Sequence, residues 1–343
     1  MEENNIMPMI TVVIIGYNIE NYIQGCLESV LNQDYSDYDV IFVDDGSTDN
    51  TCNIAKNIAL QNNKLQIVSK KNGGIVSARK AGLKEARGEY ICFIDGDDIV
   101  NSDMLKHLAE SIIGSSDRID IVSSDMWREE KNGKYIAITN NIKELECRDN
   151  VFFELIMQDL AIHHMFPKLY RRKFLLEAGY LDYPEVTMAE DLMTNIFLGV
   201  NNPVVVFSNT INYYYRYNAT SVSRIGNLSL LKQVQTLEYI EEYLSKNLRE
   251  DKYRQLMDYQ WFSYVYTYTN SPIHHSVKRE MVLKCYDRLI GYKKNDFCKS
   301  VLDNNPWHLN IVFYMYYHKI FFAGAIDSIL SGLKLFKLGM IKK

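Results

Sequence analysis

The sequence predicts an α/β fold in which helices flank a mostly parallel sheet, followed by a C-terminal helical module. Two observations carry this prediction. Short β-branched runs alternate with amphipathic stretches through residue 98, which is the pattern of parallel strands joined by right-handed crossovers. Charged, tyrosine-rich helical stretches then dominate from Leu228. We therefore expect two domains, residues 1–225 and residues 226–343.

The composition is that of a folded protein of 343 residues, with 47% hydrophobic and 24% charged residues. A net charge of -5 argues against a general nucleic-acid binder, and an anionic ligand would need positive charge from a bound metal. The segment Met1–Pro8 lacks the basic and apolar regions of a secretory signal, so we expect a cytoplasmic protein. The scattered cysteines include no C-x-x-C pair and are expected as buried thiols: Cys26, Cys52, Cys92, Cys147, Cys285 and Cys298.

The first two strand–helix units are readable from periodicity. Residues 9–15 form a β-branched run that predicts a buried strand, and apolar residues at helical spacing follow over residues 19–31. Residues 39–43 predict a second strand, which ends in an acidic turn. Asp49 in that turn is the expected N-cap of the next helix.

The next units follow the same pattern. Residues 65–68 predict a third strand, residues 70–74 a basic loop with two glycines, and residues 76–86 a helix that carries Arg79 in its first turn. The uncharged run Tyr90–Ile94 then predicts a strand buried on both faces. These strands place their C-terminal ends at one edge of the sheet.

Three carboxylates, Asp95, Asp97 and Asp98, follow the Tyr90 strand around Gly96. Acids crowded at a sheet edge repel one another unless a cation lies between them, and hard oxygen ligands suit Mg²⁺ or Mn²⁺. The structural alternative is a polar loop that caps a helix beginning at Asp103. Tyr17, Asp45 and the Asn72–Arg79 region also follow strand ends, which favours one ligand-binding crevice.

The order of these motifs resembles the family 2 glycosyltransferases of the GT-A fold, over residues 9–225. One departure is Ile15, where the family usually has proline, a change of backbone rigidity rather than of chemistry. The matching motifs are Val-Ile-Ile-Gly-Tyr-Asn at 13–18, Leu27–Gln33, Val43–Asp49, Asn72-x-Gly74-x-x-x-Ala78-Arg79-x-x-Gly82, Gly88-x-Tyr90-Ile91 and Asp95-x-Asp97-Asp98.

The resemblance implies a Rossmann-like catalytic domain and a nucleotide-diphospho-sugar donor, with UDP as the expected nucleotide. In family members the counterpart of Asp97 binds Mn²⁺ or Mg²⁺ directly, that of Asp95 supports the nucleotide or the metal, and that of Asp45 accepts the N–H of the base. Tyr17 and Arg79 are expected to line the same donor site. Lys71 is a further candidate for neutralising phosphate.

A second acidic pair, Glu190 and Asp191, precedes an amphipathic helix spaced by Leu192, Ile196 and Phe197. By pattern alone these acids complement the helix dipole. The stretch from Lys168-Leu169-Tyr170-Arg171 onward resembles the family's K-L-(Y/F)-R to E-D region, however. This implies Asp191 as general base, with Glu190 holding the acceptor or adjusting its neighbour. A single base opposite the leaving group implies inversion.

Weaker candidates lie downstream. His163 and His164 could line the acceptor site, although a histidine pair without an acid at ligand spacing is more often structural. Arg216 and Arg224 follow a tyrosine run that resembles a late family segment closing over the diphosphate, with aromatic strand packing as the alternative.

The C-terminal region 226–343 is expected to be helical. Its end, residues 307–343, is apolar and basic without an uncharged run long enough to span a bilayer. We expect either peripheral contact with the inner face of the cell membrane, where a lipid-linked acceptor would lie, or contact with a second subunit in a homo-oligomer.

The sequence thus predicts a metal-dependent hexosyl- or N-acetylhexosaminyl-transferase that acts on a saccharide or lipid-linked acceptor in cell-surface polysaccharide synthesis. One alternative is a sugar-nucleotide-forming nucleotidyltransferase, which needs a Gly-rich, Arg-bearing loop where Gly16-Tyr17-Asn18 stands. Another is a non-catalytic nucleotide-sugar-binding scaffold. A dinucleotide-dependent oxidoreductase is disfavoured because no G-x-G-x-x-G follows the first strand.

Overall fold

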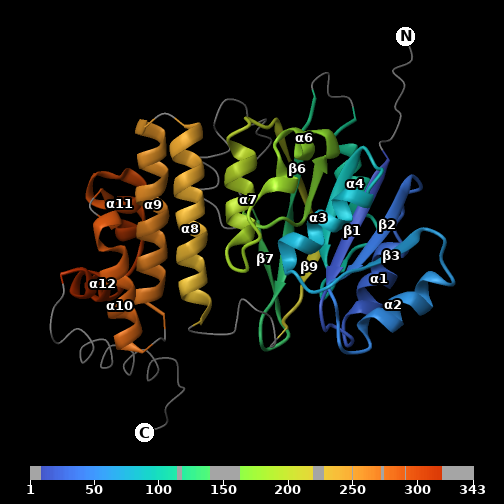
Figure 1. The fold of residues 1–343 in the computed structure, drawn as a ribbon, viewed down its shortest axis with the longest axis horizontal. Helices are drawn as coiled ribbons and strands as arrows, with labels where there is room; N and C mark the ends of the chain where they lie inside the picture. Colours follow the sequence, from blue (N-terminus) through green and yellow to red (C-terminus); the bar gives the residue numbers. More distant parts are fainter. Residues whose placement is uncertain are drawn as a thin grey trace, which may run out of the picture. The chain divides into compact units, whose positions relative to one another are not determined.

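The computed structural model describes residues 9–113, 118–139, 163–218, 228–248, 250–271, 274–289 and 291–318 (Figure 1). The chain divides into two compact units. The first comprises Met1–Ile225 with Lys232–Ile240, and the second comprises Gly226–Leu231 with Glu241–Lys343.

A nine-stranded sheet organises the first unit, in the order β3-β2-β1-β4-β8-β6-β9-β5, with β7 paired to β6. The strands are β1 (Ile10–Gly16), β2 (Tyr38–Asp44), β3 (Leu65–Ser69), β4 (Tyr90–Asp95), β5 (Ile99–Val100), β6 (Ile121–Glu129), β7 (Tyr135–Ile138), β8 (Lys168–Arg171) and β9 (Val205–Tyr215). The run β3-β2-β1-β4 is parallel throughout. The predicted α/β fold is confirmed, and antiparallel pairings of β8 with β4 and β6 extend the sheet beyond its parallel part.

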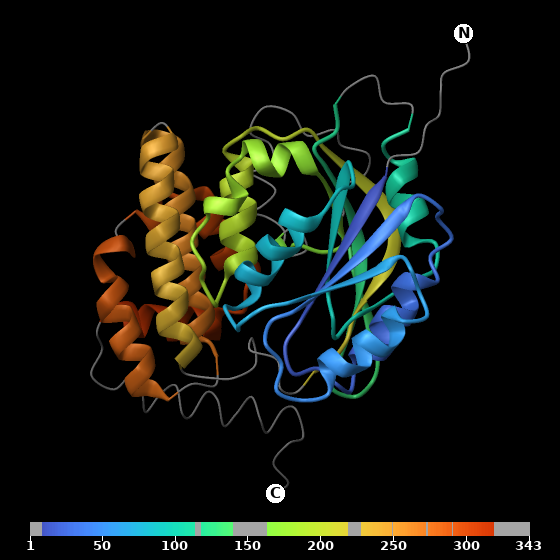
Figure 2. The same cartoon turned by 45° about the vertical axis from the view of Figure 1, so that its right-hand side comes forward.

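The helices of the first unit cover both faces of this sheet. They are α1 (Ile23–Leu31), α2 (Thr51–Ala59), α3 (Ile75–Glu85), α4 (Met104–Glu110), α6 (Arg172–Glu177) and α7 (Glu190–Gly199). Side chains of β1 alternate between the faces: Val12 and Ile14 join the core with α1, whereas Val13 meets α3 at Gly82. Figure 2 shows α1 and α3 on opposite sides of the strands.

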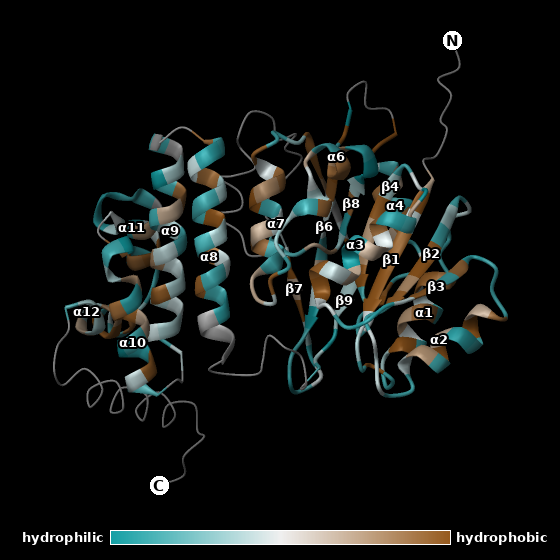
Figure 3. Cartoon of the chain, in the orientation of Figure 1, coloured by the Kyte–Doolittle hydropathy of each residue, from teal (hydrophilic) through white to brown (hydrophobic). Residues whose placement is uncertain are grey.

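The strands of the parallel part are apolar and buried, as the sequence predicts. Every residue from Tyr90 to Ile94 is buried, and Figure 3 shows β1 and β4 coloured predominantly as hydrophobic. Burial on both faces leaves the polar residues to the strand ends. The chemistry of the unit is therefore concentrated at the C-terminal edge of β1, β2 and β4.

The expected cap at Asp49 is wrong by one residue. Asn50 is the N-cap of α2 and makes no side-chain capping bond. The Asp49 carboxylate instead accepts hydrogen bonds from the backbone N–H groups of Thr51 and Glu20, at 3.0 and 3.1 Å. It thereby joins the loop after β2 to the loop after β1, a long-range contact that local capping rules do not indicate.

The second unit is helical. The remaining helices are α8 (Leu228–Asn247), whose middle belongs to the first unit, α9 (Glu250–Thr269), α10 (His275–Cys285), α11 (Asp296–Asn304) and α12 (Trp307–Tyr317). Phe262 of α9 stacks on Tyr292 at 5.4 Å between ring centroids and meets Phe313 edge-on at 5.2 Å. The aromatic residues of α9 therefore pack a core.

Among the helices that the structure describes, none is both long and apolar enough to cross a bilayer. The five described cysteines carry free thiols, and four of them are buried. Cys147, Arg224 and the stretch 319–343 lie outside the described residues.

Candidate active site

The turn after β4 is built around Gly96. A Cβ on this glycine would lie 2.8 Å from the carbonyl oxygen of Ile15 and 2.6 Å from Ile19 Cδ1, so only glycine lets β4 leave the sheet beside β1. Two residues later, Asp98 is fully buried. Tyr213 Oη donates to Asp98 Oδ2 at 2.5 Å, and the backbone N–H of Arg216 donates to Oδ1 at 2.9 Å. Asp98 thus anchors the turn to the end of β9.

Asp97 occupies the half-buried position between these anchors. Asn218 Nδ2 donates to Asp97 Oδ2 at 2.9 Å, and Arg216 Nε donates to its backbone carbonyl. Within the described residues, Oδ1 of Asp97 accepts no hydrogen bond. The turn is therefore held by its backbone and one oxygen, which leaves the other oxygen for a ligand.

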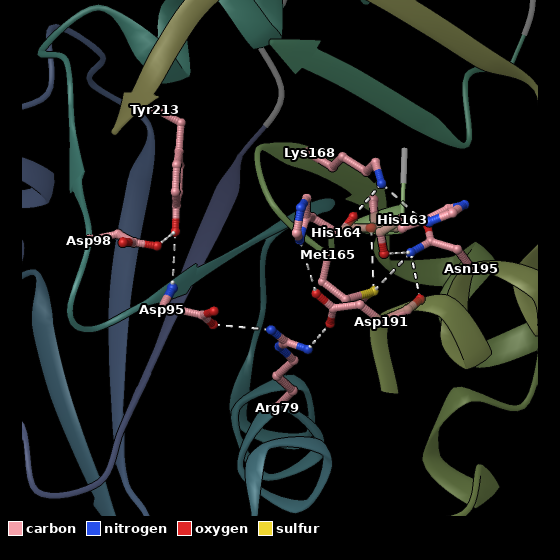
Figure 4. A network of polar contacts seen from close by, with 11 residues as sticks. Arg79, Asp95, Asp98, His163, His164, Met165, Lys168, Asp191, Asn195 and Tyr213 are labelled. Carbon is pink, nitrogen blue, oxygen red and sulfur yellow. Dashed lines mark hydrogen bonds and ion pairs between the residues drawn. The ribbon is translucent and has the colours of Figure 1, made fainter. Parts of the chain in front are cut away.

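Arg79 connects two acids that are distant in the sequence. Its guanidinium donates to Asp95 Oδ1 at 3.0 Å and to Asp191 Oδ1 at 2.6 Å, across 112 residues in the second case (Figure 4). The Arg79 side chain is 1% exposed, against 21% for Asp95 and 16% for Asp191. The end of β4 and the start of α7 therefore meet at a buried cation.

The two acids respond differently to this shared partner. Burial raises the pKa of Asp95 to about 6, although the Arg79 charge opposes the rise. Burial alone would also raise the pKa of Asp191, but the Arg79 charge and the neighbouring His164 outweigh it and hold that pKa well below its usual range. Asp191 is therefore ionised. A bound cation would stabilise the ionised form of Asp95, which burial disfavours.

The start of α7 is held in an uncommon backbone conformation. Ala189, its N-cap, has φ 55°, in the left-handed region that side chains disfavour. Thr236 Oγ1 donates to the Met188 carbonyl at 2.7 Å, and Asn195 Nδ2 donates to the Asp191 carbonyl at 2.7 Å. Burial and then the Asp191 charge raise the pKa of Glu190 to about 7. Tertiary contacts, in addition to the helix dipole, therefore position Glu190 and Asp191.

His164 lies against the free side of Asp191. Its Nδ1 is 3.8 Å from Asp191 Oδ2, and its ring stacks on Phe166 with 5.0 Å between centroids. Lys168 is fully buried and donates to the His164 carbonyl and to Asn195 Oδ1. The Lys168 segment therefore fixes the backbone that carries the histidine.

Asp45 lies at the end of β2 and is engaged by the glycine loop. Its carboxylate accepts from Lys70 Nζ at 2.6 Å, from the Gly73 N–H at 3.0 Å and from the Gly74 N–H at 2.7 Å. A Cβ on the adjacent Gly46, which has φ 78°, would lie 2.7 Å from the backbone nitrogen of Asn72. Asp45 therefore shapes the loop that leads into α3.

The structure joins Arg79, Asp95 and Asp191 directly, and Asp97 and Asp45 follow neighbouring strands. Tyr17, which follows β1, is 47% exposed. Lys71 is exposed, and it is Lys70 that pairs with Asp45. The basic loop 70–74 and the tyrosine run before Arg216 stand out in the sequence, but no local pattern marks Lys70, Tyr213 or Asn218 individually as site residues. Arg216, a candidate for contact with diphosphate, supports the acidic turn.

The carboxylates after β4 suit a divalent cation whose remaining ligands come from the substrate. Among the described residues, no three His, Cys, Asp or Glu side chains converge as a ready-made metal cage. Mg²⁺ sites commonly use one or two carboxylates, substrate phosphates and waters. Asp97 has an oxygen to offer and Asp95 has a raised pKa, so this pair matches the requirement.

Comparisons with known proteins relate this chain to glycosyltransferases. The family model described as glycosyl transferase family 2 matches residues 11–177. The uncharacterized glycosyltransferase EpsJ of Bacillus subtilis is 29% identical over 222 residues, covering 64% of each chain. The hyaluronan synthase of Pasteurella multocida is 41% identical over 102 residues, which are 30% of this chain and 10% of the synthase. The match thus spans less than two thirds of either relative.

A solved structure shares the fold along nearly the whole chain. Residues 1–349 of Staphylococcus aureus TarS, in complex with UDP-GlcNAc, superpose with a TM-score of 0.67 at 20% identity. The superposition covers 96% of this chain and 92% of that structure. The shared architecture therefore includes both the sheet and helices of the C-terminal region.

Proposed function

Because this chain belongs to glycosyl transferase family 2, we propose that it is a metal-dependent, inverting glycosyltransferase. It moves a sugar from a nucleotide-diphospho-sugar, with UDP as the nucleotide, to a hydroxyl of a saccharide or lipid-linked acceptor in cell-surface polysaccharide synthesis. The observation that carries the proposal is the Arg79 bridge between Asp95 and Asp191. It brings the acids after β4 and the acid that opens α7 into one site, as sugar transfer requires.

The donor side of the proposed site is the turn after β4. Asp97, assisted by Asp95, would hold Mn²⁺ or Mg²⁺, which supplies Lewis-acid stabilisation of the departing diphosphate. Asp98 and Arg216 keep the turn in place from β9. Because the chain is acidic overall, with a net charge of -5, a metal is the natural source of positive charge for an anionic donor.

The base side of the proposed site is Asp191. Arg79 keeps this carboxylate ionised, so it can promote loss of the proton from the acceptor hydroxyl. The acceptor oxygen then attacks the anomeric carbon from the side opposite the diphosphate. A single displacement of this kind inverts the anomeric centre, and Glu190 is left to hold the acceptor.

Recognition of the nucleobase of the donor is assigned to Asp45 and the loop that it organises. Both Asp45 oxygens already accept hydrogen bonds from residues 70–74. The imide N–H of uracil would therefore replace Lys70 as a partner of Asp45, and the lysine would remain near the base oxygens. TarS binds UDP-GlcNAc on the same fold, which supports a UDP-linked hexose or N-acetylhexosamine donor here, with Tyr17 at the donor site.

Residues 226–343 are proposed to act as an accessory helical region, and residues 1–225 as the catalytic domain. Trp307 and Ile311 of α12 are 70% and 39% exposed, which supports contact of this region with a membrane surface or a second subunit. Sedimentation of the full chain with anionic liposomes, and loss of that sedimentation at high salt, would support peripheral membrane contact. A salt-independent dimer would favour the subunit contact instead.

The proposed function is tested by the release of UDP from a panel of UDP-sugars with saccharide acceptors. Asp191→Asn should bind donor normally and lose transfer by a factor on the order of 10²–10⁴. Asp182→Asn, an exposed acid beside α6, is the matched control and should keep wild-type turnover. Normal turnover in Asp191→Asn would remove the base assignment. Metal-independent binding of NAD or a nucleoside triphosphate would point to a different enzyme class.

A further inference from the structure

The two oxygens of Asp191 have different surroundings. Oδ1 accepts from Arg79 at 2.6 Å, so a strong charge-assisted bond occupies it. Oδ2 faces His164 Nδ1 at 3.8 Å (Figure 4). The histidine side chain is 33% exposed and the aspartate side chain 16%. An incoming molecule therefore has better access to the imidazole than to the carboxylate behind it.

The imidazole is also held in a defined orientation. Phe166 stacks on its ring and in turn stacks on Tyr213, with 4.6 Å between the Phe166 and Tyr213 centroids. Tyr213 is the residue that donates to Asp98 in the turn after β4. A continuous row of rings thus links His164 to the acidic turn of the proposed donor site, and it limits the positions that the histidine can adopt.

A carboxylate bound to a buried guanidinium is a weak base, because the cation stabilises its ionised form. An imidazole backed by a carboxylate is better suited to accept a proton, since the carboxylate fixes the tautomer and stabilises the imidazolium that forms. Nδ1 of His164 faces Asp191, and the carboxylate favours the tautomer with the proton on Nδ1, which leaves Nε2 as the basic nitrogen. Within the described residues, Nε2 has no protein hydrogen bond.

We propose that His164 is a second catalytic residue, the one that takes the proton from the acceptor hydroxyl, and that Asp191 acts through it. This inference rests on the proposed glycosyl transfer. The acceptor O–H bond breaks, its proton moves to Nε2, and the oxygen forms a bond to the anomeric carbon. The bond from that carbon to the diphosphate breaks, and its electron pair leaves with the diphosphate. The imidazolium then returns its proton to water.

The test is transfer by His164→Ala and His164→Gln in the full chain, with donor binding measured alongside. Both variants should keep the donor KM and lose kcat by a factor on the order of 10²–10⁴. Added imidazole should restore part of the activity of His164→Ala, because it can occupy the space left by the ring. Neither a purely structural role nor a purely acceptor-binding role predicts this rescue.

The chain contains a matched control pair away from this site. His107 Nδ1 of α4 lies 3.8 Å from Asp103 Oδ2, with the histidine side chain 32% exposed. His107→Ala should therefore keep wild-type kcat, with or without imidazole. Wild-type kcat in either His164 variant would overturn the inference and leave the proposed function standing. A second result would overturn it as well: a folded His164→Ala variant that binds donor but has lost kcat, and whose kcat imidazole does not restore. Absence of transfer by the wild-type protein from every donor would overturn both.

Discussion

Asp95 and Asp191 are held by the same guanidinium, with Arg79 nitrogens 3.0 Å from the first carboxylate and 2.6 Å from the second. One acid ends the central strand β4 and the other lies in the first turn of α7. A buried cation between two acids offsets part of the negative charge that they would otherwise leave uncompensated. It also fixes the distance between the two sides of the proposed reaction.

Arg79→Ala should destabilise the protein strongly, because two largely buried carboxylates would lose their shared partner. Breaking a buried pair in this way typically costs about 3–5 kcal/mol, measured here as the free energy of unfolding in urea. Lys173→Ala is the control, since Lys173 is 74% exposed and lies 3.7 Å from Glu177. Its effect should stay below about 1 kcal/mol. Equal effects of the two substitutions would contradict a structural role for the bridge.

Tyr213→Phe should loosen the acidic turn, because it removes the hydroxyl that donates to Asp98 at 2.5 Å. Asp98 is fully buried, so a hydrogen bond lost there is not replaced by water. The expected cost is about 1.5–3 kcal/mol in thermal unfolding. Tyr214→Phe keeps its edge-on contact with Tyr135 and should be nearly neutral. A neutral Tyr213→Phe would show that the turn does not need this anchor.

Glu190 should make stability fall as pH rises. Its pKa is about 7 in the folded protein against an ordinary value of 4.5. Between these values the unfolded chain has released the proton that the folded chain still binds, so the folded state loses stability until about pH 7 and the loss is constant above it. Glu190→Gln should remove this loss. The free energy of unfolding of the variant relative to wild type should therefore grow by on the order of 2–3 kcal/mol between pH 4.5 and pH 8. A difference independent of pH would show that Glu190 ionises normally.

Gly82→Ala should be destabilising although it lies in a helix. A Cβ at Gly82 would lie 2.2 Å from Val13 Cγ1 in the core, so α3 would have to move away from β1 at a cost of about 1–3 kcal/mol. Gly25→Ala in α1 is the matched control, because its Cβ would meet only Arg216 Nη1 at 3.8 Å. That substitution should be neutral or stabilising by up to about 1 kcal/mol. Differential scanning calorimetry of both variants compares them, and a stable Gly82→Ala would contradict the close approach.

The parallel part of the fold follows from local patterns. The runs at 9–15, 39–43, 65–68 and 90–94 coincide with β1 to β4 to within a residue or so at each end, because each is apolar, short and followed by turn residues. The antiparallel strands β6 to β8 have no such regular spacing with helices between them. The pairings of β8 with β4 and with β6 depend on contacts between distant segments, which periodicity does not encode.

The candidate site was predictable in its residue types but not in its partners. Asp95, Asp97 and Asp191 could be selected because they follow motifs at strand and helix ends. No local sequence pattern indicates that Arg79 pairs with Asp191, that Lys70 pairs with Asp45, or that Tyr213 donates to Asp98. These three contacts join residues that lie 112, 25 and 115 positions apart in the sequence. Only the packed fold determines them.

The most direct test of the account is isothermal titration of UDP into the wild-type protein and Asp97→Asn, with Mn²⁺ or with chelator. UDP should bind the wild type with Mn²⁺, and its affinity should fall on the order of 100-fold with chelator and in Asp97→Asn. Asp103→Asn, an acid at the start of α4, should bind like the wild type. UDP binding that is equally tight in chelator, or unchanged in Asp97→Asn, would contradict a metal-assisted donor site at the end of β4.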